Sequence, residues 1–464
     1  MAKARGHESL RVGRRSRLLA GLLLLGLVGA TSDVAPAQAA NTVTIGPFSV
    51  IPDTLLPFYL TPFGNQLVFT TDYNRVMITG GATAHTLRDS RPLSCGSPGP
   101  HDLTRFKSSI LFGGGQTDDE LWRTNGTAAG TVLVRNIDPA HTSGSTECPL
   151  HSHPTGFATL GQWSLFAATV HSTTGRELWR TDGTTKGTAL VRDIAPGRVS
   201  STPTQVTPWV SYAYFSASTL SAGRELWKTN GTAAGTRMVR NIRPGRASSG
   251  PTSITLAGGQ MFFTATDGPH GRELWRTNGT YTGTVMVKDI AHGTASSSPN
   301  HLVAVGGTLY FLADDRTHGE QLWKSNGTAA GTVMVKYLGA GSKNVRSLAA
   351  VGNRLYFAAS TPGVGNAFWS SLGTTATTHE VAPVAVGADT IADVAGVAMF
   401  AGNDGTHGLE PWVSDGTASG THMLADVWPG TESSLPRDFT YAGGRVYFLD
   451  NYDAYLWTAT VTSS

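Results

Sequence analysis

Short apolar runs separated by glycine-containing turns recur along most of this chain. Around Trp275 four such runs follow one another, at residues 252–258, 260–266, 272–277 and 284–290. Runs this short, alternating or continuously apolar, are typical of half-buried and buried strands rather than of helices. Asn278-Gly279 follows the third run, and Asn-Gly readily adopts the positive φ angles of a tight hairpin. The pattern therefore predicts four antiparallel strands joined by turns.

The whole four-run unit repeats. A tryptophan occupies the same place in the third run of eight units, at intervals of 57, 48, 48, 48, 46, 43 and 45 residues: Trp122, Trp179, Trp227, Trp275, Trp323, Trp369, Trp412 and Trp457. A ninth, degenerate unit has Met77 in this place, 45 residues before Trp122. A period in the forties with four strands per unit is typical of β-propeller blades. We expect an all-β fold, a β-propeller of four-stranded antiparallel blades.

The two ends of the chain bear on the number of blades. The last unit, residues 435–464, offers only three runs, and residues 41–50 (NTVTIGPFSV) form an extra run before the first unit. We expect this N-terminal strand to complete the last blade and close the ring, which leaves no free sheet edge. Nine units predict nine blades. An eight-bladed ring with one unit packed outside and an open solenoid are the alternatives.

The N-terminal segment predicts that the protein is exported, and the charge argues against nucleic-acid binding. Charged residues make up 14% of the 464 residues and the net charge is +3, too low to indicate nucleic-acid binding. The first forty residues have a basic start, an apolar run at 18–30 and small residues before position 41, as in a signal peptide. Arg14-Arg15 is a twin-arginine pair. The twin-arginine export motif prefers an apolar residue where this chain has Arg17, so we favour the general export route. We expect residues 1–40 to be a signal peptide and residues 41–464 a single propeller domain. It would be secreted, periplasmic or at the cell surface, without a membrane span.

One stretch resembles a known family. The sequence ELWRTDGTTKGTALVRDIAPG, residues 177–197, is similar to the signature of the bacterial ELWxxDGT repeat proteins. Five units match it well, around Trp122, Trp179, Trp227, Trp275 and Trp323, and the unit around Trp412 matches it in part. The resemblance implies an exported, propeller-like protein, and it brings no catalytic residues.

The repeated residues have structural explanations. A tryptophan in mid-strand of every unit is more often core than a platform for sugars. A glutamate stands two positions before it in five units: Glu120, Glu177, Glu225, Glu273 and Glu410. Residues two apart on a strand share a face, so this carboxylate needs a partner. We expect ion pairs with the fourth-run cations Arg135, Arg192, Arg240, Lys288 and Lys336.

Two groups of residues are candidates for a site. Acidic residues precede a glycine-rich bend in three loops, Asp267, Asp314 with Asp315, and Asp404, and such loops are candidate Ca²⁺ sites. The other group lies in and beside the links that precede and follow the second unit. Cys95 and Cys148 are the only cysteines, and in an exported protein they predict a disulfide. His101, His151 and His153 lie close to them in sequence, so a Zn²⁺ or Cu²⁺ site is the alternative to the disulfide.

No nucleophile elbow, phosphate loop or paired acids can be recognised in the sequence. We therefore expect an exported binding or scaffold protein, a monomer without a cofactor, whose loops recognise an extracellular protein or glycan. A secreted hydrolase or lyase with its site near the histidine-rich early loops is one alternative. A surface-layer or adhesin-like structural protein is the other.

Overall fold

The computed structural model describes residues 43–463 except 53–55, 72–73, 91–98, 116–118, 140–150, 340–344, 362–363, 389 and 451–454. The predicted signal peptide, residues 1–40, lies outside the described residues. Cys95 and Cys148 do as well, so their disulfide stays a prediction. The described residues belong to one compact unit, Asn41–Ser464.

The described residues are built from strands and contain no α-helix. The first three sheets are four-stranded. They comprise β3 (Pro57–Phe63), β4 (Gln66–Thr71), β5 (Arg75–Thr79) and β6 (Ala84–Asp89); β7 (His101–Phe106), β8 (Ser109–Gly114), β9 (Glu120–Thr124) and β10 (Val132–Arg135); and β11 (Thr155–Leu160), β12 (Trp163–Val170), β13 (Gly175–Thr181) and β14 (Ala189–Arg192).

Three further four-stranded sheets follow in the chain. They comprise β15 (Thr204–Trp209), β16 (Tyr212–Thr219), β17 (Gly223–Thr229) and β18 (Arg237–Arg240); β19 (Thr252–Ala257), β20 (Gln260–Thr266), β21 (Arg272–Thr277) and β22 (Val285–Lys288); and β23 (Asn300–Val305), β24 (Thr308–Asp314), β25 (Glu320–Ser325) and β26 (Val333–Lys336). All their pairings are antiparallel, so a β-propeller architecture with a repeated blade is confirmed.

The units around Trp369 and Trp412 are joined. They comprise β27 (Val345–Val351), β28 (Arg354–Thr361), β29 (Gly365–Ser371), β30 (His379–Val386), β31 (Ala392–Val394), β32 (Val397–Asn403), β33 (Glu410–Ser414) and β34 (His422–Met423). β30 has eight residues, whereas the fourth strands of the preceding four sheets have four, and its end pairs with β32 through Ala385–Asn403 and Val386–Gly402. The result is one eight-stranded sheet in place of two separate ones.

The last sheet contains strands from both ends of the described chain. It comprises β35 (Arg437–Ala442), β36 (Arg445–Leu449) and β37 (Leu456–Ser463), with β1 (Val43–Ile45) and β2 (Ser49–Val50) both paired to β37. The N-terminal run thus lies antiparallel to the last strand, with Val43 opposite Ser463.

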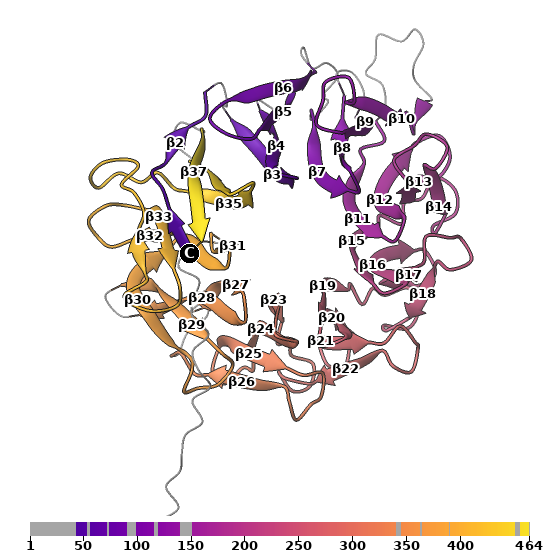
Figure 1. The fold of residues 1–464 in the computed structure, drawn as a ribbon. Coiled ribbons are helices and arrows are strands. Elements are labelled where there is room, and N and C mark those ends of the chain that lie inside the picture. Colours follow the sequence, from indigo (N-terminus) through magenta and orange to yellow (C-terminus); the bar gives the residue numbers. More distant parts are fainter. Residues whose placement is uncertain are drawn as a thin grey trace, which may run out of the picture. The chain divides into compact units, whose positions relative to one another are not determined.

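The sheets lie beside one another in chain order (Figure 1). The first strand of each unit contacts the first strand of the next in the series β3, β7, β11, β15, β19, β23, β27, β31 and β35, and β35 contacts β3. The hydrophobic core consists of layers of apolar side chains, each packed between two neighbouring sheets. In one such layer Tyr214 and Leu226 of the β15–β18 sheet pack with Phe263 and Trp275 of the next sheet. Apolar side chains are buried on both faces of the sheets, which explains the continuous apolar runs.

The tryptophans of the repeat belong to these layers. Six of them are less than a tenth exposed, Trp122, Trp179, Trp227, Trp275, Trp323 and Trp412, and Trp369 and Trp457 are partly buried. Rings enclosed in this way have no free face for stacking on a sugar.

The predicted ion pairs of the repeated glutamates are wrong. Glu177 accepts hydrogen bonds from the backbone N–H groups of Ile194 and Ser201, at 3.0 and 2.9 Å, and from the Ser201 hydroxyl at 2.6 Å. The same arrangement recurs at Glu120, Glu225, Glu273 and Glu410, each with a serine of the following link. A buried carboxylate can be satisfied by several N–H and O–H donors without a cation. Each glutamate therefore holds the link that leads to the next sheet.

The fourth-strand cations have different partners. Arg192 Nη1 donates to the carbonyl of Thr236 at 2.6 Å, and Lys288 Nζ donates to that of Thr332 at 3.0 Å, in both cases in the next sheet. Arg135, Arg240 and Lys336 do the same. These cations tie neighbouring sheets together through the turns between third and fourth strands.

Those turns are wider than the predicted tight hairpin. Asn278 Oδ1 accepts hydrogen bonds from the N–H and the hydroxyl of Thr280, and the hydroxyls of Thr277 and Thr284 bond at 2.7 Å. Gly279 has φ +84°, whereas Asn278 does not have a positive φ. The asparagine therefore acts through its side-chain oxygen, which an aspartate supplies equally well at Asp182 and Asp415.

The buried glutamates predict an unusual pH dependence of stability. Burial raises the pKa of Glu120 to about 7, although hydrogen bonds from Ile137 and Ser152 lower it. Burial also raises the pKa of the other four, Glu177, Glu225, Glu273 and Glu410. A folded carboxyl with a raised pKa keeps a proton that the unfolded chain has lost, so the free energy of unfolding falls as pH rises from about 4.5 to about 7. Glu120 alone contributes at most about 3 kcal/mol.

Urea denaturation measures this effect. We expect a lower urea midpoint at about pH 7.5 than at about pH 5. His270 and His407 act in the same direction, because hydrogen bonds to Asp267 and Asp404 raise their pKa. A midpoint that increases between these two pH values would contradict the raised pKa of the glutamates.

Candidate functional site

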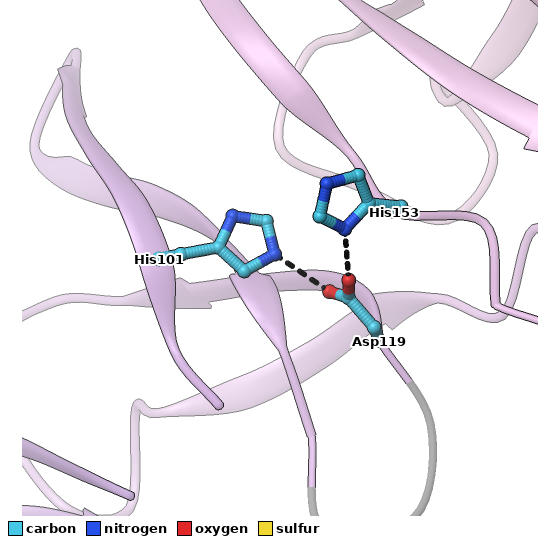
Figure 2. Close-up of side chains that lie close together, drawn as sticks. All are labelled: His101, Asp119 and His153. Carbon is cyan, nitrogen blue, oxygen red and sulfur yellow. Dashed lines mark hydrogen bonds and ion pairs between the residues drawn. The ribbon is translucent and has the colours of Figure 1, made fainter. Parts of the chain in front are cut away.

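Four positions between two neighbouring sheets depart from the repeat. His101 is the first residue of β7, Asp119 directly precedes β9, and His151 and His153 lie in the link that enters β11. We call these four residues the His–Asp seam, because they lie where the β7–β10 sheet meets the β11–β14 sheet. Figure 2 shows the rings of His101 and His153, each bonded to one carboxylate oxygen of Asp119.

Asp119 holds two imidazoles at once. His101 Nε2 lies 2.8 Å from Oδ1 of Asp119, and His153 Nδ1 lies 2.5 Å from Oδ2. The centres of the two rings are 4.9 Å apart. The side chains of Asp119 and His101 are 1% and 7% exposed, whereas that of His153 is 51% exposed. The cluster is therefore buried on one side and open to solvent at His153.

The electrostatics favour a charged Asp119. Burial raises the pKa of this carboxyl, but the hydrogen bonds and charges of His101 and His153 outweigh it and hold the pKa below its usual range. Arg176 adds a positive field, and its Nη1 donates to the carbonyl of His153 at 2.8 Å. With Asp119 ionised, the two ring nitrogens that face it each carry a proton.

The corresponding position has the opposite charge in three other units, whereas the unit around Trp323 has Glu320, which accepts a hydrogen bond from Asn300. Arg176, Arg224 and Arg272 stand where this unit has Asp119, directly before the repeated glutamate. The side chain of Arg272 donates to the hydroxyls of Thr252 and Thr264. Thr252 occupies the place of His101, and so do Thr155 and Thr204. A structural arginine–threonine contact is thus replaced by an aspartate–histidine contact at the seam.

His151 takes over a structural contact. In four units the N–H before the glutamate donates to a serine hydroxyl, as from Arg176 to Ser200 at 2.9 Å. At the seam the N–H of Asp119 donates to Nδ1 of His151 at 3.1 Å. Because Nδ1 accepts this bond, the proton of the neutral ring is on Nε2. His151 therefore positions the backbone of Asp119.

A glycine makes room for His101. A Cβ on Gly113 would lie 2.4 Å from Cε1 and 2.6 Å from Nε2 of His101. The corresponding positions of the next four units have side chains, at Ala167, Ser216, Thr264 and Leu312. The imidazole of His101 thus fits in this unit because Gly113 has no side chain.

The aspartates of the candidate Ca²⁺ loops pair with neighbouring histidine or arginine side chains of their own loops. Asp267, Asp315 and Asp404 each pair with the histidine three residues later, at 2.7–2.8 Å between Nδ1 and a carboxylate oxygen, and Asp314 pairs with Arg316. These aspartates lie in three separate loops and accept hydrogen bonds from N–H donors. Within the described residues, the only group of three side chains arranged to hold a metal ion is His101, Asp119 and His153.

The structure thus brings together two of the three predicted histidines and adds an aspartate that the sequence analysis did not single out. A signal for Asp119 was present, because an acid stands there in place of the arginine of three other units. The arrangement can serve two kinds of chemistry. Two imidazoles and a carboxylate suit a divalent transition metal, and a buried carboxylate that orients an exposed imidazole suits proton transfer.

Comparison with known proteins adds little about this site. No family model matches the chain, and no curated protein is significantly similar in sequence. Solved structures with similar folds include the computationally designed Ika8 protein, with 12% identity and a TM-score of 0.44 over 89% of this chain and 98% of that chain. BamB from Moraxella catarrhalis has 11% identity and a TM-score of 0.40 over 90% of this chain and all of that chain.

A puromycin hydrolase S511A mutant is also similar, with 15% identity and a TM-score of 0.39 over 75% of this chain. The aligned region spans only 57% of that hydrolase. Such distant similarities assign no role to any residue of this chain. In the described residues no helix has the length and apolar character needed to cross a bilayer.

Proposed function

We propose that the protein is an exported propeller of nine blades, a member of the ELWxxDGT repeat family, that binds an extracellular protein or glycan at the His–Asp seam. The observation that carries the proposal is the replacement of the structural arginine, threonine and serine by Asp119, His101 and His151 at one seam. The repeated glutamates and the fourth-strand cations all have structural partners. In this proposal the repeated units make the scaffold rigid, and the residues of the His–Asp seam determine which partner it binds.

The ring is proposed from contacts between first strands. Nine first strands contact one another in sequence, and the ninth, β35, contacts the first, β3. The pairing of β1 with β37 supports closure, since it gives the last sheet a strand from the N-terminus. A closed ring of nine units leaves its outer loops as the variable surface.

Restoring the repeat at the seam tests the binding function. In the variant H101T/D119R/H151S/H153T each new residue is the one that the next unit has, at Thr155, Arg176, Ser200 and Thr202. We expect this variant to fold with an unchanged or higher melting temperature, because functional residues are often retained at a cost in stability. Its binding to the partner should fall at least about tenfold, a loss of about 1.4 kcal/mol.

The measurement compares the mature wild-type protein with this variant. Both are tested on immobilised bacterial envelope polysaccharides and on purified secreted proteins of the same culture. A ligand retained by the wild type and lost by the folded variant supports the proposal. Equal binding by both proteins, or no ligand for the wild type, contradicts it.

One observation favours a second function, that of a hydrolase or lyase. His153 is half exposed and its Nδ1 is bonded to a buried carboxylate, an arrangement in which Nε2 can accept a proton from a substrate. Release of products from a bound glycan, abolished in His153→Thr, would favour the enzyme over the scaffold. For the surface-layer alternative, the discriminating measurement is self-association in gel filtration.

A further inference from the structure

The His–Asp seam combines features that a resident cation would explain. Asp119 is a buried carboxylate, and the two groups that face it are imidazoles rather than a lysine or arginine. Arg176 contributes only at longer range, since its hydrogen bonds go to His153, Thr155, Thr169 and Ser200. Burial of a charge is costly unless it is paired or coordinates a metal.

We infer that His101 Nε2, His153 Nδ1 and a carboxylate oxygen of Asp119 form a binding site for a divalent transition-metal ion of the Zn²⁺ type. This inference rests on the proposal that the seam is the working site of the protein. The three ligand atoms lie within 4.8 Å of one another. Ligands of a tetrahedral Zn²⁺, at about 2.0–2.1 Å from the ion, are about 3.3 Å apart. The two nitrogen–oxygen contacts, to Oδ1 at 2.8 Å and to Oδ2 at 2.5 Å, need to open by less than about 1 Å. Ligand atoms that are now up to 4.8 Å apart need to move closer by up to about 1.5 Å.

The chemistry of the donors selects the ion. Imidazole nitrogens suit Zn²⁺, Cu²⁺ and Ni²⁺, whereas Ca²⁺ and Mg²⁺ require oxygen ligands. On binding, each neutral imidazole moves its proton to the ring nitrogen that faces away from Asp119, and a protonated imidazole releases a proton. Affinity therefore falls at acidic pH.

The surroundings indicate a site that is open on one side. His101 is fixed by burial against Gly113, and Asp119 is held by the bond from its N–H to His151. His153 is half exposed, so it can adjust to the ion. Three protein ligands with an open position are typical of Zn²⁺ sites that bind a further molecule. The ion would thus contribute a coordination position for an oxygen or nitrogen atom of the extracellular partner.

Titration calorimetry with Zn²⁺ on the mature, EDTA-treated protein tests the site without any partner. We expect one Zn²⁺ per chain. Asp119→Asn and His101→Thr should weaken binding at least about 100-fold. His292→Thr is the matched control, because this exposed histidine lies outside the seam, and it should change the affinity by less than about threefold. The visible absorption of Co²⁺ bound at this site should disappear in Asp119→Asn and in His101→Thr.

Several results would overturn the inference. One is the absence of Zn²⁺ binding, and another is binding that Asp119→Asn and His101→Thr leave unchanged. Loss of binding in C95S/C148S alone would assign the ion to the cysteines. Partner binding is measured in parallel with EDTA and with Zn²⁺. If Zn²⁺ binds but no partner is found, the metal site stands and the proposed function fails. If a partner binds at the seam equally well with EDTA, the metal inference fails and the function stands.

Discussion

Glu273→Ala is expected to lower the free energy of unfolding by about 4 kcal/mol. Glu273 accepts hydrogen bonds from the N–H groups of Ile290 and Ser297, at 3.1 and 2.9 Å, and from the Ser297 hydroxyl. Alanine leaves these buried donors without an acceptor, and each such group costs about 1–3 kcal/mol. Because these bonds hold the link between two sheets, the loss should also loosen the contact between those sheets.

Two further variants make the measurement specific. Glu273→Gln should cost about 1–3 kcal/mol, because one amide oxygen remains but the NH₂ group faces other donors. The natural Gln321 avoids this conflict, since its Nε2 donates to the carbonyls of His318 and Gly339. Glu432→Ala removes an exposed carboxylate and should change stability by less than about 0.5 kcal/mol. If urea denaturation finds Glu273→Ala as mild as this control, the hydrogen bonds do not hold the sheets together.

The strands could be predicted because their signal is local and repeated. The four runs expected around Trp275 correspond to β19–β22 within two residues at each end. Apolar runs, turn glycines and the period all indicate the same blade, and nine copies reinforce one another. The joining of β30 to β32 could not be predicted, because it depends on the length of one strand and not on its composition.

The partners of the repeated glutamates needed a comparison between units. Ser201, Ser249, Ser297 and Ser434 each lie 24 residues after a glutamate. Where the glutamate is replaced by Gln321, the residue 24 positions later is Val345, so the two positions change together. Charge alone suggested the fourth-strand cations. Backbone N–H groups donate to the carboxylates instead. Because every residue except proline has this group, the sequence does not show which residues will be the donors.

The site was only partly predictable for a similar reason. The histidines were singled out because they lie close to the two cysteines in sequence, but their spacing did not show which of them meet. His101 and His153 are 52 residues apart in sequence and face one carboxylate, whereas His151 turns to the backbone. Asp119 becomes visible only when it is aligned with Arg176 and Arg224. Residues that replace a structural contact in one unit of a repeat are therefore the ones to test for function.

Deletion of residues 41–51, which include β1 and β2, is expected to have the second large effect. Ile51 is fully buried, and Ile45 and Phe48 pack against the core of the last sheet. Each large apolar side chain contributes about 1.5–3 kcal/mol, so we expect a loss of about 5 kcal/mol. The deletion also removes bonds from Gly46 N–H to Thr460 and from Ile51 N–H to Leu456. It exposes the edge of β37, and an unpaired edge promotes association.

Thermal denaturation and gel filtration measure both consequences, a lower melting temperature and the formation of oligomers. Ile51→Ala and Val50→Ala form a matched pair, since Ile51 is fully buried and Val50 is 37% exposed. Only Ile51→Ala should be strongly destabilising, by about 2–4 kcal/mol. A synthetic peptide of residues 41–51 added to the deletion variant should restore the monomer by pairing with β37. A deletion variant that stays monomeric with the wild-type melting temperature would show that the N-terminal strand does not complete the last blade.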